Sequence, residues 1–137
     1  MGQMYPDRGI AVITGSSTGI GFELARCAAI DGYDLVIAAD EPEIHDAAAL
    51  LNDHGVSIRA VEADLSTPEG IARLVDVIDD DGRPVELLMA NAGRGLGRAF
   101  LDQSFDDIRR VVETNVLGTL DLVHRVGRQM REHGFGR

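Results

Sequence analysis

The sequence predicts an α/β fold, in which a doubly wound parallel sheet of about four strands is flanked by helices. Four short apolar runs alternate with segments whose apolar residues recur every three or four positions. Strands that alternate with helices form successive βα units, which give a parallel sheet with right-handed crossovers. The runs are apolar throughout, as expected for strands that are covered on both faces. No linker or repeat interrupts the pattern, so we expect one domain over residues 9–137 after a flexible leader, residues 1–8.

The first two units follow from their apolar runs and their helix signals. Residues 9–14 and 34–39 are the predicted strands, and residues 19–29 form the helix between them. That helix is expected to end near Gly32, because glycine suits the C-terminus of a helix. Pro42 favours the first turn of a second helix, which runs to about residue 52.

The third unit begins with a predicted strand at residues 56–61. Ser66 or Thr67 is the expected cap of the next helix, with Pro68 directly inside it. The acidic run at residues 79–82 is interpreted as a solvated turn.

The fourth unit has its strand at residues 85–90, followed by a glycine-containing loop, residues 94–99. Its segment 94–98 either lines the substrate side or, as is more usual for a glycine loop with two arginines, is exposed to solvent. Ser104 opens the longest helix, whose first turn carries two favourable aspartates. The three-and-four spacing predicts six turns with one inner face, formed by Ile108, Val111, Val112, Asn115, Val116, Thr119, Leu122, Val123, Val126 and Met130.

Composition and charge exclude several classes of function. A formal charge of −10 argues against nucleic acid and anionic membrane surfaces as partners. No apolar run approaches the roughly 18 residues of a membrane span, and the N-terminus lacks the features of a secretory signal, so we expect a cytoplasmic protein. The four histidines have no metal-ligand spacing, and no metal site is predicted. Cys27, the only cysteine, is expected to pack on the helical stripe of Ile20 and Leu24.

A glycine-rich turn joins the first strand to the first helix. Gly15 can adopt the backbone angles of a tight turn, Gly19 leaves the backbone open to a ligand, and Gly21 allows the helix to lie close to the strand. The first turn of a helix has N–H groups without internal partners and the positive end of the helix dipole, which together suit a phosphate. The candidate binding residues of this turn are Gly15, Ser17, Thr18, Gly19, Ile20 and Gly21.

Polar residues also follow the other three strands. Asp40 comes 19 residues after Gly21, where a carboxylate can accept hydrogen bonds from ribose hydroxyls. Asp64 and Leu65 follow the third strand, and the fourth ends in Asn91, Ala92 and Gly93. Ligands of such sheets bind beyond the carboxyl ends of the strands. Four such features at one edge predict a dinucleotide site.

The same turn allows a second interpretation. Residues 15–19 match Gly-x-Ser-x-Gly, the nucleophile motif of α/β hydrolases, which would make Ser17 a nucleophile. In that fold, however, the motif follows a central strand, and no spacing here joins Ser17 to His124 or His133. A serine hydrolase is therefore the remote alternative.

Four motifs in this order resemble the short-chain dehydrogenase/reductase family of the classical type: residues 14–21, Asp64-Leu65, Asn91-Ala92-Gly93 and residues 115–118. The resemblance extends from about residue 9 to residue 137 and covers the N-terminal, cofactor-binding half of the family. It implies a Rossmann-type sheet that binds NAD or NADP and supports hydride transfer to or from an alcohol or carbonyl carbon.

The resemblance also implies roles for individual residues. Asp64 would contact the adenine, and Asn91, Ala92 and Gly93 would support the sheet and the cofactor ribose. Asn115 matches a helix asparagine that helps to hold a proton-relay water near the catalytic lysine. Its structural alternative is a buried polar residue that satisfies a helix bend. Asp40 favours NAD, because a carboxylate would repel the 2′-phosphate of NADP.

The chain departs from the family at the residues that carry out the chemistry. The family's Tyr-x-x-x-Lys pair would follow the helix asparagine, but this sequence has only Tyr5 and Tyr33 and no lysine. We therefore expect the chain by itself to be inactive, either as part of a longer dehydrogenase or as a non-catalytic dinucleotide-binding module. An open edge at the fourth strand and an apolar helix face would favour association, so we expect a homo-oligomer, a dimer or a tetramer.

Overall fold

The structure is a computed structural model that describes residues 8–137, and it confirms the α/β fold. Its four strands are parallel and lie in the order β3-β2-β1-β4, with β1 and β2 at the centre. The strands are β1 (Ile10–Thr14), β2 (Asp34–Ala39), β3 (Ile58–Glu62) and β4 (Val85–Met89). Their ends lie within one residue of the prediction, except that the third strand begins two residues later.

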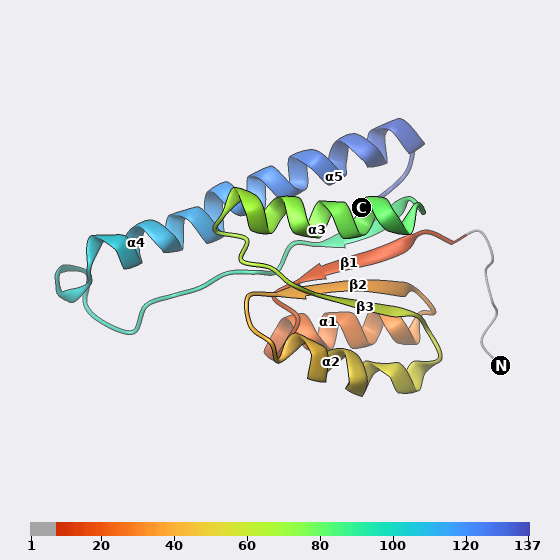
Figure 1. Cartoon of the computed structure of the whole chain (residues 1–137), viewed down its shortest axis with the longest axis horizontal. Helices are drawn as coiled ribbons and strands as arrows, with labels where there is room; N and C mark the ends of the chain where they lie inside the picture. Colours follow the sequence, from red (N-terminus) through yellow and green to blue (C-terminus); the bar gives the residue numbers. More distant parts are fainter. Residues whose placement is uncertain (1–7) are drawn as a thin grey trace.

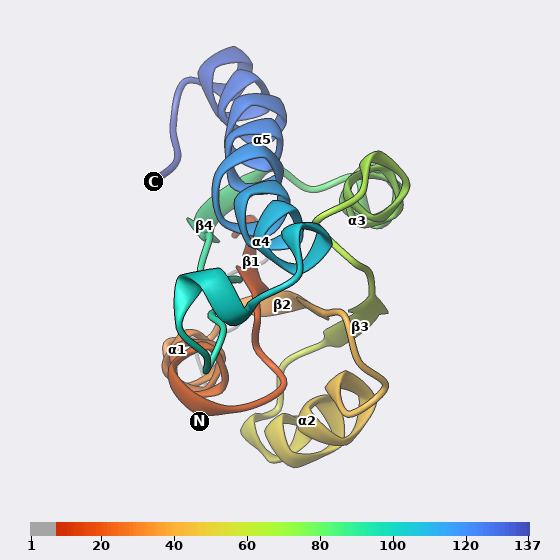
Figure 2. The ribbon, with the colours of Figure 1, turned by 90° about the vertical axis from the view of Figure 1, so that its left-hand side faces the viewer.

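Helices cover both faces of the sheet (Figure 1), and the view along the sheet in Figure 2 separates the same two layers. The helices α1 and α2 lie against one face, whereas α3 and α5 lie against the other, and α4 extends beyond the strand ends. Their bounds are α1 (Gly19–Ile30), α2 (Ile44–Leu51), α3 (Pro68–Asp81), α4 (Phe105–Val112) and α5 (Thr119–His133), and short helical turns occur at η1 (Asn52–His54), η2 (Phe100–Asp102) and η3 (Glu113–Gly118).

Each face of the sheet has its own core. Alternate residues of β1 point in opposite directions, so that Ala11 and Ile13 pack with α1 and α2, and Ile10 and Val12 pack with α3 and α5. All five residues of β1 are buried, which explains why its sequence is continuously apolar.

Three local predictions are wrong. Cys27 is exposed, and Ile20 is 75% exposed, because the buried stripe of α1 runs through Gly21, Ala25, Ala28 and Ala29 instead. Pro42 precedes α2, which begins only at Ile44. The acidic run is the last turn of α3 up to Asp81, and it ends at Gly82 with a φ of 78°. The cap of α3 is confirmed as Thr67, whose hydroxyl oxygen accepts a hydrogen bond from the Gly70 amide.

The predicted six-turn helix is interrupted. It begins after Ser104 as expected, but a π-helical turn, η3, separates α4 from α5. The Thr119 hydroxyl donates a hydrogen bond to the Thr114 carbonyl, five residues earlier, at 3.3 Å. The buried residues of η3 and α5 are Thr114, Gly118, Leu122 and Val126. Of the predicted inner residues, Val112, Asn115, Val116 and Val123 are exposed.

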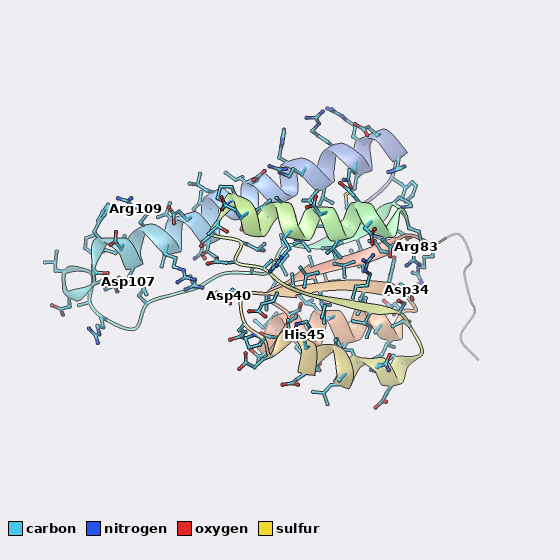
Figure 3. The ribbon with its side chains drawn as sticks, in the orientation of Figure 1. Asp34, Asp40, His45, Arg83, Asp107 and Arg109 are labelled. Atoms are coloured by element: carbon cyan, nitrogen blue, oxygen red, sulfur yellow. The ribbon has the colours of Figure 1, made fainter. Side chains whose placement is uncertain are left out.

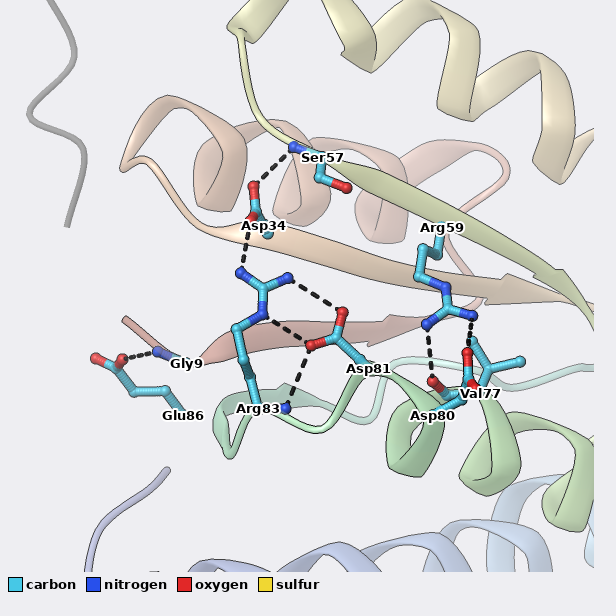
Figure 4. Close-up of polar contacts among 9 residues, drawn as sticks. All are labelled: Gly9, Asp34, Ser57, Arg59, Val77, Asp80, Asp81, Arg83 and Glu86. Atoms are coloured by element: carbon cyan, nitrogen blue, oxygen red, sulfur yellow. Dashed lines mark hydrogen bonds and ion pairs between the residues drawn. The ribbon is translucent and has the colours of Figure 1, made fainter. Parts of the chain in front are cut away.

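Polar side chains close the amino ends of the strands (Figure 4). The Arg83 guanidinium pairs with Asp34 at 2.6 Å and with Asp81 at 2.8 Å, and Asp34 also accepts a hydrogen bond from the Ser57 amide at 2.7 Å. Glu86 accepts hydrogen bonds from the Gly9 amide at 3.2 Å and from the Tyr33 hydroxyl at 3.0 Å. These contacts connect β2, α3 and β4 with the loop residues at this end of the sheet.

The edge of the sheet at β4 carries one further residue. The Arg137 amide donates to the Glu86 carbonyl at 3.1 Å, and the Leu88 amide donates to the Arg137 carbonyl at 2.8 Å. This is the hydrogen-bond pattern of a parallel pair, so α5 returns the chain to the edge of β4 in a parallel direction.

The predicted leader, residues 1–8, lies outside the described residues apart from Arg8, whose guanidinium is 3.7 Å from the centroid of the Tyr33 ring. Within residues 8–137, none of the helices combines the length and the apolar character needed to cross a membrane. The same part of the chain has no cluster of three His, Cys, Asp or Glu side chains that could hold a metal ion.

Candidate functional site

The glycine turn after β1 has the geometry of a ligand-binding turn. Gly15 and Gly19 have φ angles of 64° and 60°, in the left-handed region that favours glycine. A Cβ atom on Gly21 would lie 2.0 Å from the Gly15 carbonyl oxygen, so only glycine permits this approach of α1 to the turn. A Cβ on Gly19 would meet nothing within 4 Å, which leaves its surroundings open.

The N-terminus of α1 is not satisfied by the protein. Thr18 occupies the cap position, but its side chain makes no capping hydrogen bond, and the first turn of α1 contains no acidic residue. The amides of this turn and the positive end of the helix dipole are therefore free to face an anion. Such a terminus suits a phosphate or a pyrophosphate.

Asn91 ties the end of β4 to the glycine turn. Its side-chain amide donates to the carbonyls of Thr14 and Gly15, both at 3.1 Å. The main-chain amides of Asn91 and Ala92 donate to the Thr14 hydroxyl at 3.1 and 3.0 Å. Asn91 thus stabilises the turn and does not line the neighbouring hollow.

A hollow lies between the carboxyl ends of the strands. Its lining residues come from the glycine turn, the ends of β2, β3 and β4, and η3, and they are Gly15, Ser17, Thr18, Ala39, Asp40, Glu41, Ala63, Asp64, Leu65, Ala92, Gly93, Arg94 and Thr114. Eight predicted binding residues are in this set. The other four, Gly19, Ile20, Gly21 and Asn91, support or flank it from the first turn of α1 and from the end of β4.

The carboxylate of Asp64 is held in an ionised, oriented form. It accepts hydrogen bonds from the Ser66 hydroxyl and amide at 2.6 and 3.0 Å and pairs with Arg110 of α4 at 2.9 Å. Burial alone would raise the pKa of Asp64, but the hydrogen bonds from Ser66 and the charges of Arg110 and Arg94 outweigh it. The pKa of Asp64 therefore lies below its ordinary value.

Asp40 and Ser17 also have partners that the sequence did not indicate. Asp40, which is labelled in Figure 3, forms an ion pair with Arg94 of the loop after β4. The Ser17 hydroxyl donates to the Glu41 carboxylate at 2.6 Å, not to an imidazole. The hydrolase alternative is therefore wrong, since a serine nucleophile requires a neighbouring base such as histidine.

Asn115 acts on the loop after β4 and does not line the hollow. Its side-chain oxygen accepts a hydrogen bond from the Arg94 amide at 2.8 Å, and its side-chain nitrogen donates to the Arg94 carbonyl at 2.9 Å. Asn115 lies within the π-helical turn and is exposed, whereas its structural alternative was a buried residue that satisfies a helix bend.

Two buried polar atoms beside the hollow have hydrogen-bonding capacity that the described residues do not use. Among the side chains of residues 8–137, the buried polar atoms that lack a hydrogen-bond partner are Arg94 Nε and Thr114 Oγ1. Both residues line the hollow. Because an unsatisfied buried polar group is costly, a ligand with hydrogen-bonding groups would stabilise this arrangement. The residues present therefore fit a dinucleotide, with free helix amides for its phosphates and carboxylates for its sugars.

Sequence reasoning did not assign Glu41, Arg110 or Thr114 to the site, and it placed Arg94 in a loop that would face either the substrate or solvent. Arg94 directly follows the Asn-Ala-Gly segment, and Thr114 directly precedes Asn115, so adjacency to a motif was the available signal. Arg110 had no such signal, because its approach to Asp64 depends on how α4 lies over the strand ends.

A sequence profile described as short chain dehydrogenase matches residues 9–137. The chain belongs to the short-chain dehydrogenase family. It is 36% identical over 130 residues to the uncharacterized oxidoreductase YohF of Escherichia coli K12, an alignment that covers 93% of this chain and 51% of that protein. The chain thus spans about half the length of the curated relatives it matches.

Solved structures of short-chain dehydrogenases superpose closely. L-Sorbose reductase from Gluconobacter frateurii, complexed with NADPH and L-sorbose, has a TM-score of 0.85 at 31% identity, over 95% of this chain and 52% of that one. NAD⁺-bound xylitol dehydrogenase has a TM-score of 0.84 at 29% identity, over 94% and 50%. One neighbour therefore holds NADPH and the other holds NAD⁺.

Tyr33, the tyrosine in the described part of the chain, does not line the hollow. Tyr33 is 4% exposed, and its hydroxyl donates to Glu86 among the polar contacts at the amino ends of the strands. Tyr5 lies outside the described residues.

Proposed function

We propose that this chain is the cofactor-binding half of an NAD(P)-dependent oxidoreductase that moves a hydride between the nicotinamide and an alcohol or carbonyl carbon. The observation that carries the proposal is the uncapped N-terminus of α1 beside a hollow with aspartates at two neighbouring strand ends. The bound cofactor supplies the hydride chemistry.

Each group of the chain has a binding role in this proposal. The first-turn amides of α1 hold the pyrophosphate, and the left-handed Gly15 and Gly19 let it approach the backbone. Asp40 accepts a hydrogen bond from a ribose hydroxyl, and Asp64 lies on the adenine side. Asn115 positions the loop at Arg94, and by family resemblance it also supports a proton-relay water.

Proton transfer to or from the substrate is not assigned to these residues. The sequence has no lysine, and the buried Tyr33 is engaged elsewhere, so we expect the 137 residues to bind cofactor without turnover. The same observation favours a second candidate, a non-catalytic dinucleotide-binding module. The first activity to test is oxidation of polyols or reduction of ketoses, because the two solved neighbours are named for such compounds. Turnover by the chain alone would contradict both candidates.

Association and location are also proposals. Val112, Val116 and Val123 are each more than 40% exposed along one rod, which favours self-association or coverage by another polypeptide. We propose a homo-oligomer, which sedimentation of the purified chain would detect, and a cytoplasmic location.

Calorimetric titration of the chain with NAD⁺ and NADP⁺ tests the proposed function. Saturable binding of either dinucleotide is the expected result, and binding of neither would overturn the proposal. Asp40 predicts a preference for NAD⁺, so Asp40→Arg should shift the preference toward NADP⁺. An unchanged preference would remove the role given to Asp40.

A further inference from the structure

Arg94 is the cation among the residues that line the hollow. Among the residues that line the hollow, three are carboxylates, Asp40, Glu41 and Asp64, and Arg94 is the single guanidinium. It reaches from the loop after β4 to the end of β2, where it pairs with Asp40. Its charge also contributes to lowering the pKa of Asp64 at the end of β3.

The main chain of Arg94 is held in place by Asn115. Asn115 binds both the amide and the carbonyl of Arg94, at 2.8 and 2.9 Å, so the main chain is held from both sides. Arg94 is only partly exposed, and its Nε atom is buried and lacks a partner. The side chain is thus held in the hollow with hydrogen-bonding capacity left over.

The pair changes the electrostatics of cofactor choice. A lone Asp40 would accept hydrogen bonds from a ribose hydroxyl and repel a 2′-phosphate. Paired with Arg94, this carboxylate is neutralised, and the guanidinium lies at the sugar-binding strand end. A guanidinium can donate two parallel hydrogen bonds to a phosphate, and the free Nε supplies one of the donors.

We propose that Arg94 determines which dinucleotide the site accepts, because it neutralises Asp40 and provides the cationic partner for the 2′-phosphate of NADP. The site then takes NADP by rotation of the guanidinium from Asp40 to the phosphate, and it takes NAD with the ion pair intact. This inference rests on the proposed function and adds to it a residue that sets specificity.

Calorimetric titration of Arg94→Ala and Arg94→Gln with NAD⁺, NADP⁺ and adenosine 2′,5′-bisphosphate tests the proposal. A charge-assisted hydrogen bond predicts a loss of NADP⁺ and bisphosphate affinity of about tenfold or more, with NAD⁺ affinity changed by less than about threefold. Asp40→Asn should raise NADP⁺ affinity, and this gain should disappear when Arg94→Gln is added. The glutamine variant retains polar contact with Asp40 in case the alanine variant folds poorly.

Arg98→Ala is the matched control, since Arg98 is exposed in the same loop and its loss removes the same charge. This control should leave the affinities for all three ligands unchanged. Equal losses for NAD⁺ and NADP⁺, or no loss for either, would overturn the role of Arg94, as would a wild-type chain that binds NAD⁺ but not NADP⁺. A wild-type chain that binds no dinucleotide would overturn both this inference and the proposed function.

Discussion

At the amino ends of the strands, Asp34, Arg83 and Asp81 form a closed network. At the carboxyl ends, Asp40 pairs with Arg94, which lines the hollow, and Asp64 pairs with Arg110 of α4. Figure 3 labels Asp34 and Arg83 at one end of the sheet and Asp40 at the other. The residue types are the same at both ends. The difference is that the carboxyl ends also have buried polar atoms without partners and an uncapped helix. Ion pairs occur at both ends, so the unsatisfied groups, and not the ion pairs, support the proposed binding site at the carboxyl ends.

The largest expected effect comes from a substitution at the carboxyl ends of the strands, beside the glycine turn. Gly21→Val places side-chain atoms against the Gly15 carbonyl, where even a Cβ would be 2.0 Å away. We expect a loss of about 2–4 kcal/mol in the free energy of unfolding and no detectable dinucleotide binding. Urea unfolding and calorimetry measure the two effects. Gly127→Ala is the control, because a Cβ on Gly127 meets nothing within 4 Å in α5, and it should be neutral or slightly stabilising.

The next largest effect comes from a substitution in the ion-pair network at the amino ends of the strands. Arg83→Met leaves Asp34 and Asp81 without their shared guanidinium, and we expect a loss of about 1–2 kcal/mol in the free energy of unfolding. Cofactor affinity should remain unchanged, since Arg83 lies at the far end of the sheet (Figure 3). Arg26→Ala, which removes an exposed pair within α1, should have a smaller effect on unfolding. A loss of cofactor affinity in Arg83→Met would show that the two ends are coupled.

The pH dependence of stability tests the network at the amino ends of the strands in another way. Hydrogen bonding to Arg83 lowers the pKa of Asp81 more than burial raises it, so the folded-state pKa lies below the unfolded one. Its stabilisation is present above the unfolded pKa of about 3.9 and is lost as pH falls through the folded pKa. Asp81→Asn should make urea stability less dependent on pH below about pH 4, whereas Asp76→Asn, on the exposed side of the same helix, should not. An unchanged acid profile in Asp81→Asn would contradict the network.

The smallest expected effect concerns Thr114. Thr114→Val replaces a buried hydroxyl that lacks a partner, so the unliganded chain should be unchanged or more stable by up to about 1 kcal/mol. If the hydroxyl contacts the bound cofactor, the same variant should bind dinucleotide a few-fold more weakly. Thermal unfolding with and without ligand separates the two effects. A clear loss of stability without ligand would show that the hydroxyl already has a partner.

Local patterns predicted the fold well because each element depends on its own residues. The positions of the strands, the cap at Thr67 and the close approach at Gly21 follow from apolar runs, a hydroxyl before proline and a glycine in a turn. Eight of the hollow's lining residues were also found, since strand ends and turns are marked in the sequence.

The failures have a common physical origin. Cys27 and Val116 were assigned to buried faces by periodicity, but a π-helical turn and small alanines changed which side of each helix packs. The pairing of Arg94 with Asp40 joins residues 54 positions apart and depends on the loop that Asn115 holds. No local pattern contains that contact.

The π-helical turn at η3 also sets how the side chains of α4 are oriented relative to those of α5. A π turn holds about one residue more than an α turn, so the residues after it are rotated by about 100° relative to an uninterrupted helix. The Arg110 side of α4 can therefore face Asp64 while Leu122 and Val126 of α5 face the core. Deleting a single residue from this turn would restore an uninterrupted α-helix from α4 to α5. Either the Arg110 side of α4 or the Leu122 side of α5 would then turn toward water.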